Sequence, residues 1–306
     1  MSKYTLMIGE FSVSQANALS DGVFLSAVPP LTAWMGLAIA LCLRLDKELL
    51  GVTPVIGEAN LHRGHAKYVR YRSGQLSDVN NRGVQHPTID DRRTSLNAYL
   101  LIDIDSDESL HEDEIQQALI GLRLAGGVMH PVRQQQRISV RVFVGDGKKT
   151  APQLALAALP SYFFLLEDAS RLVLAAREQG GLQGFDILTA PLRRWAGDET
   201  PAEQKKHLQL PERPVWLPDK QHGYFRPMAV GYQLLENPQQ RQGARNNLPH
   251  AFAEPVFTLI RFRSVASVRK SHNPRSGDGG YVWRPGARAE NVLGACLVAP
   301  TKKRLS

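Results

Sequence analysis

The sequence predicts an α+β fold, compatible with a ferredoxin-like core that carries an inserted β-hairpin. Segments with the alternation typical of strands are interleaved with segments of helical spacing. Over residues 1–150 their order is strand, helix, hairpin, strand, helix, strand. The chain has 306 residues, of which 43% are hydrophobic and 22% charged, so it can bury a substantial core.

The first strand and the first helix follow from local composition. Residues 4–13 are rich in strand-forming side chains, and a turn-rich stretch follows them. Pro29 and Pro30 then precede an apolar run that ends near Leu45, which predicts a helix with Pro30 at its first position. Because this helix is apolar all round, we expect it to be covered on every side. Its nearly unbroken apolar stretch, 31–43, is 13 residues long and too short to cross a bilayer.

A charged hairpin is expected within residues 52–95. Between Glu58 and Asp78 the chain has no acidic residue but several histidine, lysine and arginine residues. Strand alternation over 67–72 places cations beside a tyrosine ring on each face, a composition suited to phosphate contact and base stacking. An edge hairpin blunted with charge would have the same composition. The candidate RNA-binding residues here are His62, Arg63, Lys67, Tyr68, Arg70, Tyr71 and Arg72.

A second strand–helix–strand series completes the predicted core. A strand is expected over 96–105. Ser109 and Glu112 match a capping box, which predicts a helix that continues to about Leu124. Residues 137–144 alternate again and predict a further strand.

Gly126 and Gly127 follow this helix and are expected to end it, because glycine readily takes the positive φ of a helix cap. A glycine pair also lets a phosphate approach exposed backbone amides, and Arg123 adds a cation beside it. These three residues therefore join the candidate RNA-binding set. Capping alone is the competing explanation, since many helices end in glycine.

The remaining chain divides by composition. Residues 1–150 form the predicted core, 151–220 a mixed helical and connecting region, and 221–306 a region of strands and basic residues. A helix is expected over 166–177, stopped by a glycine pair, and a strand over 224–235.

Positive charge is concentrated in the last 46 residues. They hold ten Lys or Arg and only two acids, and the resulting +8 equals the net charge of the whole chain. Such a field attracts a polyanion. A solvated tail would also be basic, but it would lack aromatic residues such as Trp283. The expected contacts to DNA or RNA are Arg261, Arg263, Arg269, Lys270, Arg275, Tyr281 and Arg284, joined by Arg241 and Arg245 from a preceding loop.

Metal and catalytic chemistry find less support. The two cysteines lie far apart without CxxC spacing, so neither a disulfide nor a zinc site is expected. Acids counted from Asp103 have the spacing of a calcium loop, but Glu108 stands where the loop needs glycine. His62, His65 and His130 could act as general bases for RNA cleavage, although a histidine in a basic strand is more often a phosphate or stacking contact. No cofactor is expected.

Three collinear segments carry a family resemblance. Ser14–Ser20 follows the first strand, Leu122–Pro131 contains the glycine pair, and Gly223–Tyr232 has the form Gly-aromatic-x-x-Pro-x-x-x-Gly-Tyr. Residues 61–63 and 252–268 fit more loosely. Together they resemble the five-prime-handle subunit of type I-F CRISPR surveillance complexes, the Csy-type member of the Cas-five group.

The resemblance implies a modified ferredoxin-like (RRM) fold with a thumb hairpin. It also implies a non-catalytic subunit that caps the 5′ handle of a CRISPR RNA (crRNA) and abuts the first backbone subunit. The carboxyl-terminal stretch is more basic than in an ordinary member, which suits a minimal variant without a large subunit, in which the handle subunit contacts target DNA. Two alternatives stay open: a repeat-processing endoribonuclease and a multi-copy backbone subunit.

The expected partners are the crRNA, a backbone subunit, target DNA and, where one is present, a large subunit. The start of the chain lacks the features of a secretory signal, which predicts a cytoplasmic protein without a membrane partner. A basic balance with no anchor favours nucleic acid over lipid.

Overall fold

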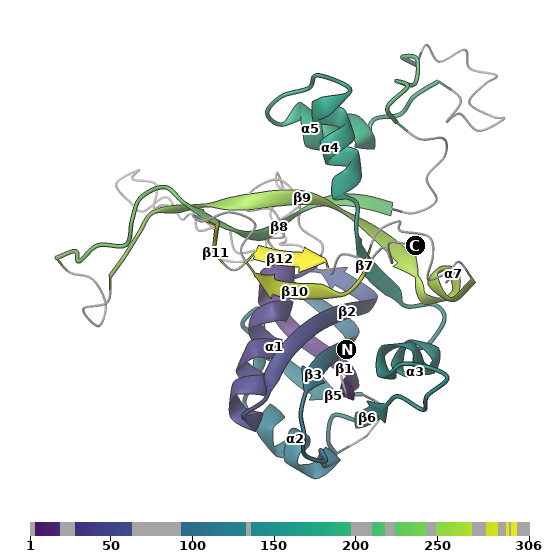
Figure 1. The fold of residues 1–306 in the computed structure, drawn as a ribbon, viewed down its shortest axis with the longest axis vertical. Coiled ribbons are helices and arrows are strands. Elements are labelled where there is room, and N and C mark those ends of the chain that lie inside the picture. Colours follow the sequence, from purple (N-terminus) through teal and green to yellow (C-terminus); the bar gives the residue numbers. More distant parts are fainter. Residues whose placement is uncertain are drawn as a thin grey trace, which may run out of the picture.

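Antiparallel strands dominate the computed structural model, with short helices on both sides of the sheet (Figure 1). The predicted α+β class is therefore confirmed. The structure describes residues 4–18, 28–62, 93–132, 136–196, 210–217, 224–242, 249–270, 280–286, 292–293 and 295–298.

The described residues of the amino-terminal half form six strands and two helices. They are β1 (Tyr4–Asn17), α1 (Leu31–Leu45), β2 (Glu48–Leu61), β3 (Arg93–Asp105), α2 (Glu112–Leu119), β4 (Arg123–Leu124), β5 (Gly127–Pro131) and β6 (Val140–Val144). The strands pair antiparallel in the order β2-β3-β1, and one edge of β1 is shared by β6 and then β5. β4 pairs with β5 and ends the sheet.

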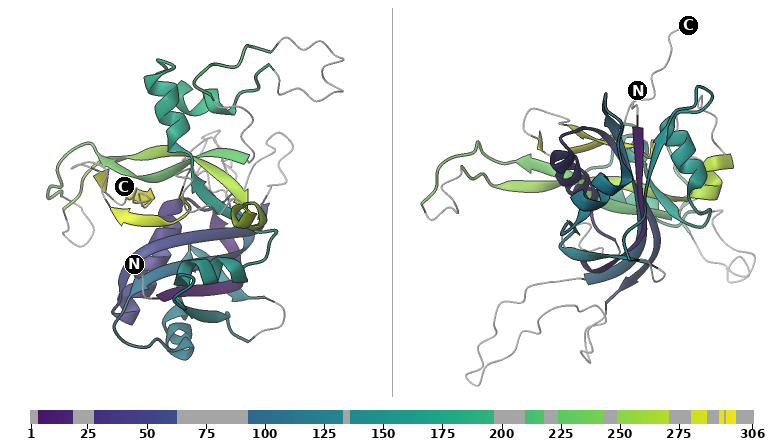
Figure 2. Two further views of the ribbon diagram at one scale, coloured as in Figure 1. Left: turned by 45° about the vertical axis from the view of Figure 1, so that its right-hand side comes forward. Right: turned by 90° about the horizontal axis from the view of Figure 1, so that it is seen from below.

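The carboxyl-terminal half extends the same sheet. Its elements are α3 (Ala151–Ala158), β7 (Phe164–Asp168), α4 (Ser170–Glu178), α5 (Asp186–Thr189), a 3-10 turn (Ala190–Leu192), β8 (Tyr224–Leu234), β9 (Ala253–Ser264), α7 (Val265–Lys270), β10 (Trp283–Gly286), β11 (Val292–Leu293) and β12 (Ala295–Val298). β7 pairs with β2 on one side and β9 on the other, so the sheet continues across the boundary predicted near residue 150. The β8–β9 ribbon projects from the body of the molecule (Figures 1 and 2).

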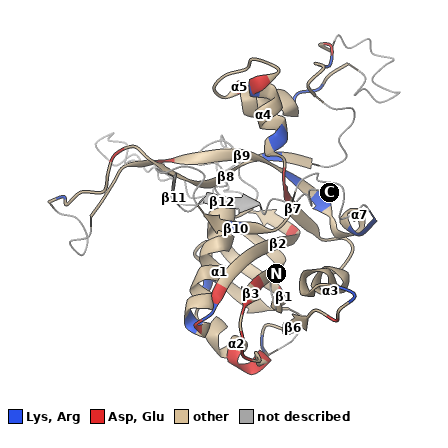
Figure 3. Cartoon of the chain, viewed as in Figure 1, with Lys and Arg blue, Asp and Glu red and all other residues tan. Residues whose placement is uncertain are grey.

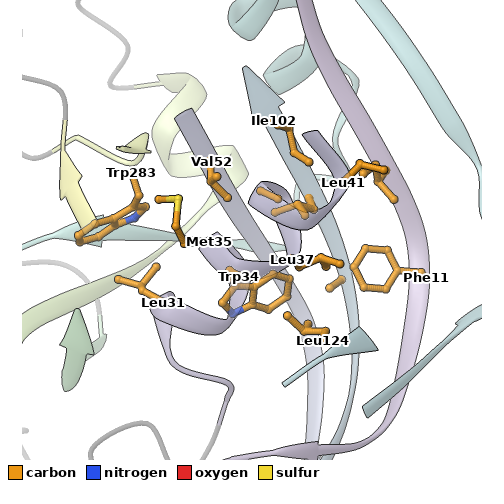
Figure 4. Packing of buried hydrophobic residues seen from close by; sticks show 14 of the residues in the cluster. Phe11, Leu31, Trp34, Met35, Leu37, Leu41, Val52, Ile102, Leu124 and Trp283 are labelled. Carbon is orange, nitrogen blue, oxygen red and sulfur yellow. The ribbon is translucent and has the colours of Figure 1, made fainter. Parts of the chain in front are cut away.

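Side chains from the two faces of the sheet pack in separate cores, as strand alternation requires, and a third, smaller cluster includes Leu172 of α4 and Leu259 of β9. Leu6 and Ile8 of β1 face α1, where Trp34 and Trp283 are fully buried (Figure 4). Met7, between Leu6 and Ile8, faces the opposite way and packs in the second core, which includes residues of α3 and α7. The aromatic and aliphatic content of the basic carboxyl-terminal segment is thus explained in part by Trp283, which belongs to the main core.

Helix α1 confirms the prediction of a helix after the proline pair, with two corrections. Pro30 is the N-cap, one residue before the predicted position. The outer face is not covered: Ile39 is 38% exposed and Leu43 is 76% exposed. The expectation of burial on every side is therefore wrong for this chain alone, because its elements cover only the faces turned toward the sheet and α2.

Helix α2 is shorter than predicted at both ends. His111 is the N-cap, so Ser109 and Glu112 do not form a capping box, and three acids fill the first turn instead, where the helix dipole favours them. The helix ends at Leu119 and does not reach Leu124. Arg44 of α1 donates from Nη1 to the carbonyl oxygens of Ala118 (2.8 Å) and Ile120 (2.7 Å), which satisfies acceptors that the helix end leaves open.

The helix predicted over 166–177 begins later. Residues up to Asp168 belong to β7, and α4 begins at Ser170. The Asp168 carboxylate accepts from the Ser170 backbone N–H (3.0 Å) and hydroxyl (2.8 Å), which stabilises the strand-to-helix turn at this position. The apolar spacing of this segment could not reveal that boundary.

Asp103 is a buried strand residue and not the start of a calcium loop. Its carboxylate accepts a hydrogen bond of 2.7 Å from the Thr5 hydroxyl on the paired strand β1. Burial raises the pKa of Asp103 to about 6, although the Thr5 hydrogen bond and the Arg284 charge act in the opposite direction.

The Asp103 carboxyl should make the free energy of unfolding decrease as the pH rises, which is the reverse of the usual effect of an aspartate. The folded protein holds the proton more tightly than the unfolded chain, so the free energy of unfolding should fall as the pH rises from 3.8 to about 6 and then level off. Asp103→Asn should remove this dependence and raise stability above pH 6 by up to about 3 kcal/mol. Urea unfolding between pH 4 and pH 8 measures this pH dependence. Asp105→Asn is the matched control, because Asp105 is exposed. An unchanged pH profile in Asp103→Asn would contradict the assignment.

Candidate nucleic-acid interface

The carboxyl end of β1 brings together segments that are far apart in the sequence. The Asn17 backbone N–H donates to the carbonyl oxygen of Ala125, at the turn between β4 and β5 (2.9 Å). On its other side Asn17 pairs with Arg93 of β3, whose Nη1 donates to the carbonyl oxygen of Gln15 (3.0 Å). Two of the segments that carried the family resemblance, Ser14–Ser20 and Leu122–Pro131, are therefore in contact.

The glycine pair does not end a helix: Gly126 lies in a hairpin turn and Gly127 begins β5. Ala125 and Gly126 have φ values of 49° and 77°, as the two central residues of a tight β-hairpin turn require. Gly126 is exposed, and a Cβ added to it would meet no atom within 4 Å. At Gly127 a Cβ would lie 2.7 Å from the Ser14 carbonyl oxygen, so only glycine lets β5 approach β1 this closely.

His62 lies just after the end of β2. A basic hairpin was expected within residues 52–95, but residues 52–61 are part of β2 and residues 93–95 are part of β3, so both ends of that range belong to the core sheet. The His62 backbone N–H donates to the Arg93 carbonyl oxygen (2.8 Å), and its Nε2 is 2.8 Å from the Ser95 hydroxyl. His62 and Arg93, which flank residues 63–92 in the sequence, are therefore in contact. The candidate residues within this segment, Arg63, Lys67, Tyr68, Arg70, Tyr71 and Arg72, lie outside the described residues.

Two of the candidate arginines in the carboxyl-terminal segment are used inside the fold. Arg261 donates from Nε and Arg263 from Nη1 (2.9 Å) to the two oxygens of Glu167 on β7. The Glu167 side chain is 2% exposed, and those of Arg261 and Arg263 are 18% and 15% exposed. A buried carboxylate that bridges two guanidiniums leaves little of their charge for an outside partner.

A third candidate, Arg269 of α7, binds the end of helix α3. Its guanidinium donates to the carbonyl oxygens of Leu156 (2.9 Å), Ala157 (2.8 Å) and Leu159, and to the Ser161 hydroxyl (3.3 Å). Cations are favourable at this position because the carbonyls at a helix end are unsatisfied and carry the negative end of the dipole. Arg269 thus fixes α7 against α3.

The other candidates have more solvent contact. Lys270 and Arg284 are exposed. Tyr281 is half-buried, and burial, with a smaller effect of the Asp103 charge, raises its pKa to about 12. Arg241 stacks over Phe252, 4.7 Å from the ring centroid, and pairs with Glu236 beyond the ends of the β8–β9 ribbon. Arg245 and Arg275 lie outside the described residues.

The structure also shows two arginine–aromatic pairs that sequence reasoning did not single out. Arg141 lies 5.0 Å from the centroid of Phe143 on β6. Arg226 lies 4.7 Å from the centroid of Tyr224 on β8 and donates to its hydroxyl. Both pairs have the spacing i, i+2, which places two strand residues on one face, so the signal was present in the sequence.

Charge is unevenly distributed over the described surface (Figure 3). Acidic residues gather on α2, whereas basic ones gather on α7 and the adjoining end of β9. In the described part of the chain no group of three or more His, Cys, Asp or Glu is placed to hold a metal ion. None of the helices in that part is both long and apolar enough to cross a membrane.

An antiparallel α+β protein with arginine–aromatic pairs, of which Arg141 and Tyr224 are exposed, and an open glycine turn is of the class suited to contact a polyanion. A family model described as CRISPR-associated protein (Cas_Csy2) matches residues 6–296, and the chain belongs to this family. The family inferred from the three collinear segments is thereby confirmed, and membership makes the chain a subunit of a Cascade-type CRISPR complex with other CRISPR-associated subunits as partners. No curated protein matches the chain.

Proposed function

We propose that the chain is the subunit of a type I-F complex that binds the 5′ handle of the crRNA without cutting it. The observation that carries the proposal is the contact between Asn17 of the segment Ser14–Ser20 and Ala125 of the segment Leu122–Pro131 at the end of β1. Both segments resemble the handle-binding subunit, and the chain belongs to the Csy2 family. The subunit would act in the cytoplasm and contact the adjacent backbone subunit.

The strand order supports a ferredoxin-like core. Within β1–α1–β2–β3–α2–β6 the pairing order is β2-β3-β1-β6, and all pairs are antiparallel. A β-α-β-β-α-β series with this arrangement is the ferredoxin-like, or RRM-like, unit. In the sequence, residues 63–92 come between the second and third strands of this unit, and they would form the thumb hairpin that the resemblance implies.

RNA binding would combine backbone and cationic contacts at the end of β1. The open turn at Gly126 allows a phosphate to approach the backbone, and His62 and Arg93 lie where the basic segment 63–92 leaves the sheet. Splayed bases would stack on Tyr68 or Tyr71, as single-stranded RNA does on exposed aromatic rings. Lys270, Tyr281 and Arg284 would form a second contact region for the guide or for target DNA.

The proposal excludes cleavage of the repeat by this chain. His62 Nε2 is already within hydrogen-bond distance of Ser95, which gives the imidazole a structural partner at the strand base. Incubation of the purified protein with repeat RNA, without divalent metal, is expected to leave the RNA intact. Cleavage that His62→Ala or His130→Ala abolishes would replace the proposal with a processing endoribonuclease.

Charge reversal tests the basic segment directly. Arg63→Glu combined with Arg70→Glu should weaken handle binding and lower the slope of log affinity against log salt by about two, because two phosphate contacts are lost. Fluorescence anisotropy over a salt series measures both quantities. Lys148→Glu with Arg177→Glu, exposed positions before α3 and on α4, makes the same change in net charge and should leave the slope near that of the wild type. Equal affinity in both double variants would remove residues 63–92 from the interface.

A further inference from the structure

A pocket opens between the end of α2, the β4–β5 hairpin and residues 136–138. Its volume, about 430 Å³, is within the range of sites that hold small ligands or side chains. Its walls combine aliphatic side chains with two arginines and three glutamines. The lining residues that matter here are Gln116, Leu119, Ile120, Arg123, Val128 and Arg137.

The rim of this pocket presents aliphatic side chains to solvent. Ile120 is 65% exposed and Val128 is 41% exposed. Ile120 is held in place, since its carbonyl oxygen accepts from Arg44 Nη1 at 2.7 Å, so its exposure does not arise from a loose helix end. Leu43, which precedes Arg44 in α1, is also exposed. Exposed aliphatic side chains on an ordered backbone beside a pocket are typical of a surface that another molecule covers.

The charged groups of the pocket are all positive. No Asp or Glu is among its lining residues. Arg123 Nη1 lies 3.4 Å from the Gly126 carbonyl oxygen, and Arg137 Nη1 lies 3.5 Å from Gln116 Oε1. Both distances are long for hydrogen bonds, so each guanidinium retains donors that a carboxylate can accept in a short, charge-assisted bond.

We propose that this pocket docks a segment of another protein subunit of the CRISPR complex, with an aliphatic or aromatic anchor beside an Asp or Glu. The inference rests on the chain's place in a multi-subunit complex and identifies the surface and chemistry of one partner. Arginine and methionine are enriched at protein interfaces, and Met129 lines this pocket. A nucleotide fits less well, because no aromatic ring is among the lining residues to stack on a base.

Photo-cross-linking tests the identity of the occupant. Benzoylphenylalanine replaces Ile120 in the complex assembled by co-expression with the neighbouring genes of its operon. The expected product is a protease-sensitive adduct with one other CRISPR-associated subunit, and the cross-linked peptide should contain an acidic residue next to an apolar one. The same group at Leu174, exposed on α4, should not give this adduct. An RNase-sensitive adduct at Ile120, or an intact complex without a protein adduct, would overturn the inference.

A double variant measures the strength of the docking. Ile120→Asp with Arg137→Glu should lower the affinity for the cross-linked subunit about 30-fold, as the loss of a central interface residue does, and change handle-RNA affinity less than about twofold. Arg123 stays unchanged because its guanidinium reaches the turn of the proposed RNA surface. Leu174→Asp with Arg177→Glu is the matched control on α4. Equal loss of partner binding in both double variants would contradict the inference.

The two proposals fail separately in these experiments. If the chain binds no handle RNA, the proposed function fails, but the protein adduct at Ile120 still supports the docking site. If RNA binds normally and the partner attaches without contact at Ile120, the docking site alone is wrong. Thermal unfolding of each double variant confirms that the chain is folded before affinities are compared.

Discussion

Glu167→Gln is expected to lower the free energy of unfolding by about 3–5 kcal/mol, among the largest effects of any single substitution in this chain. The wild-type carboxylate is almost fully buried and receives hydrogen bonds from Arg261 and Arg263. Glutamine keeps the shape but leaves two largely buried guanidiniums without an opposite charge. Urea unfolding followed by circular dichroism measures the change.

Two controls separate charge pairing from packing. Glu108→Gln removes an exposed carboxylate (78% exposed) that pairs with Lys47, and it should change stability far less. Replacing Glu167, Arg261 and Arg263 together with methionine should return stability to near the wild-type value, because no buried charge then lacks a partner. If Glu167→Gln alone unfolds at the wild-type urea concentration, the two arginines are not committed to Glu167 and are open to nucleic acid.

Gly127→Val is expected to cost about 3 kcal/mol and to weaken handle binding. The added Cβ would lie 2.7 Å from the Ser14 carbonyl oxygen and 2.8 Å from the Ala16 Cα, and both are backbone atoms that cannot move independently. Relief of this contact requires β5 to shift away from β1. The turn that brings Gly126 to the end of β1 would shift with it. Urea unfolding and anisotropy with handle RNA measure the two effects.

Gly126→Asn is the matched control one residue earlier. Gly126 has a positive φ, 77°, which Gly127 does not, and no atom would lie within 4 Å of a Cβ added to Gly126. Asparagine accepts the left-handed conformation, so the expected cost is below about 1 kcal/mol. If the two substitutions destabilise equally, the close approach of β5 to β1 does not explain the glycine at position 127.

The strands and helices that were predicted well are those with strong local patterns. The first and third strands could be located from alternation, and α1 from an unbroken apolar run, because both patterns are visible within a short stretch of sequence. The end of α2 could not, because Leu122–Leu124 continue the helical spacing and the deciding contacts come from Arg44, about 75 residues earlier. The exposed face of α1 could not be predicted either, since the pattern shows an apolar surface but not what covers it.

Predicting the candidate site from the charge of the sequence met the same limit. The count of ten cations in the last 46 residues was correct, but it could not show that Arg261 and Arg263 meet Glu167 across a strand pair. It also could not show that Arg269 caps α3, more than 100 residues away. A charge count predicts the sign of a field, whereas long-range pairing decides which cations remain exposed. The role of the exposed ones in binding stays a prediction.

The most direct test of handle binding at the end of β1 is ultraviolet cross-linking of the complex, purified with its operon neighbours and its own RNA, followed by peptide mapping. We expect one copy of this chain per guide and cross-links between the 5′ end of the RNA and peptides that contain Gln15–Asn17, residues 62–93 or Ala125–Gly127. Cross-links confined to α4 and α5, or a complex in which the 5′ end contacts only other subunits, would contradict the proposed function.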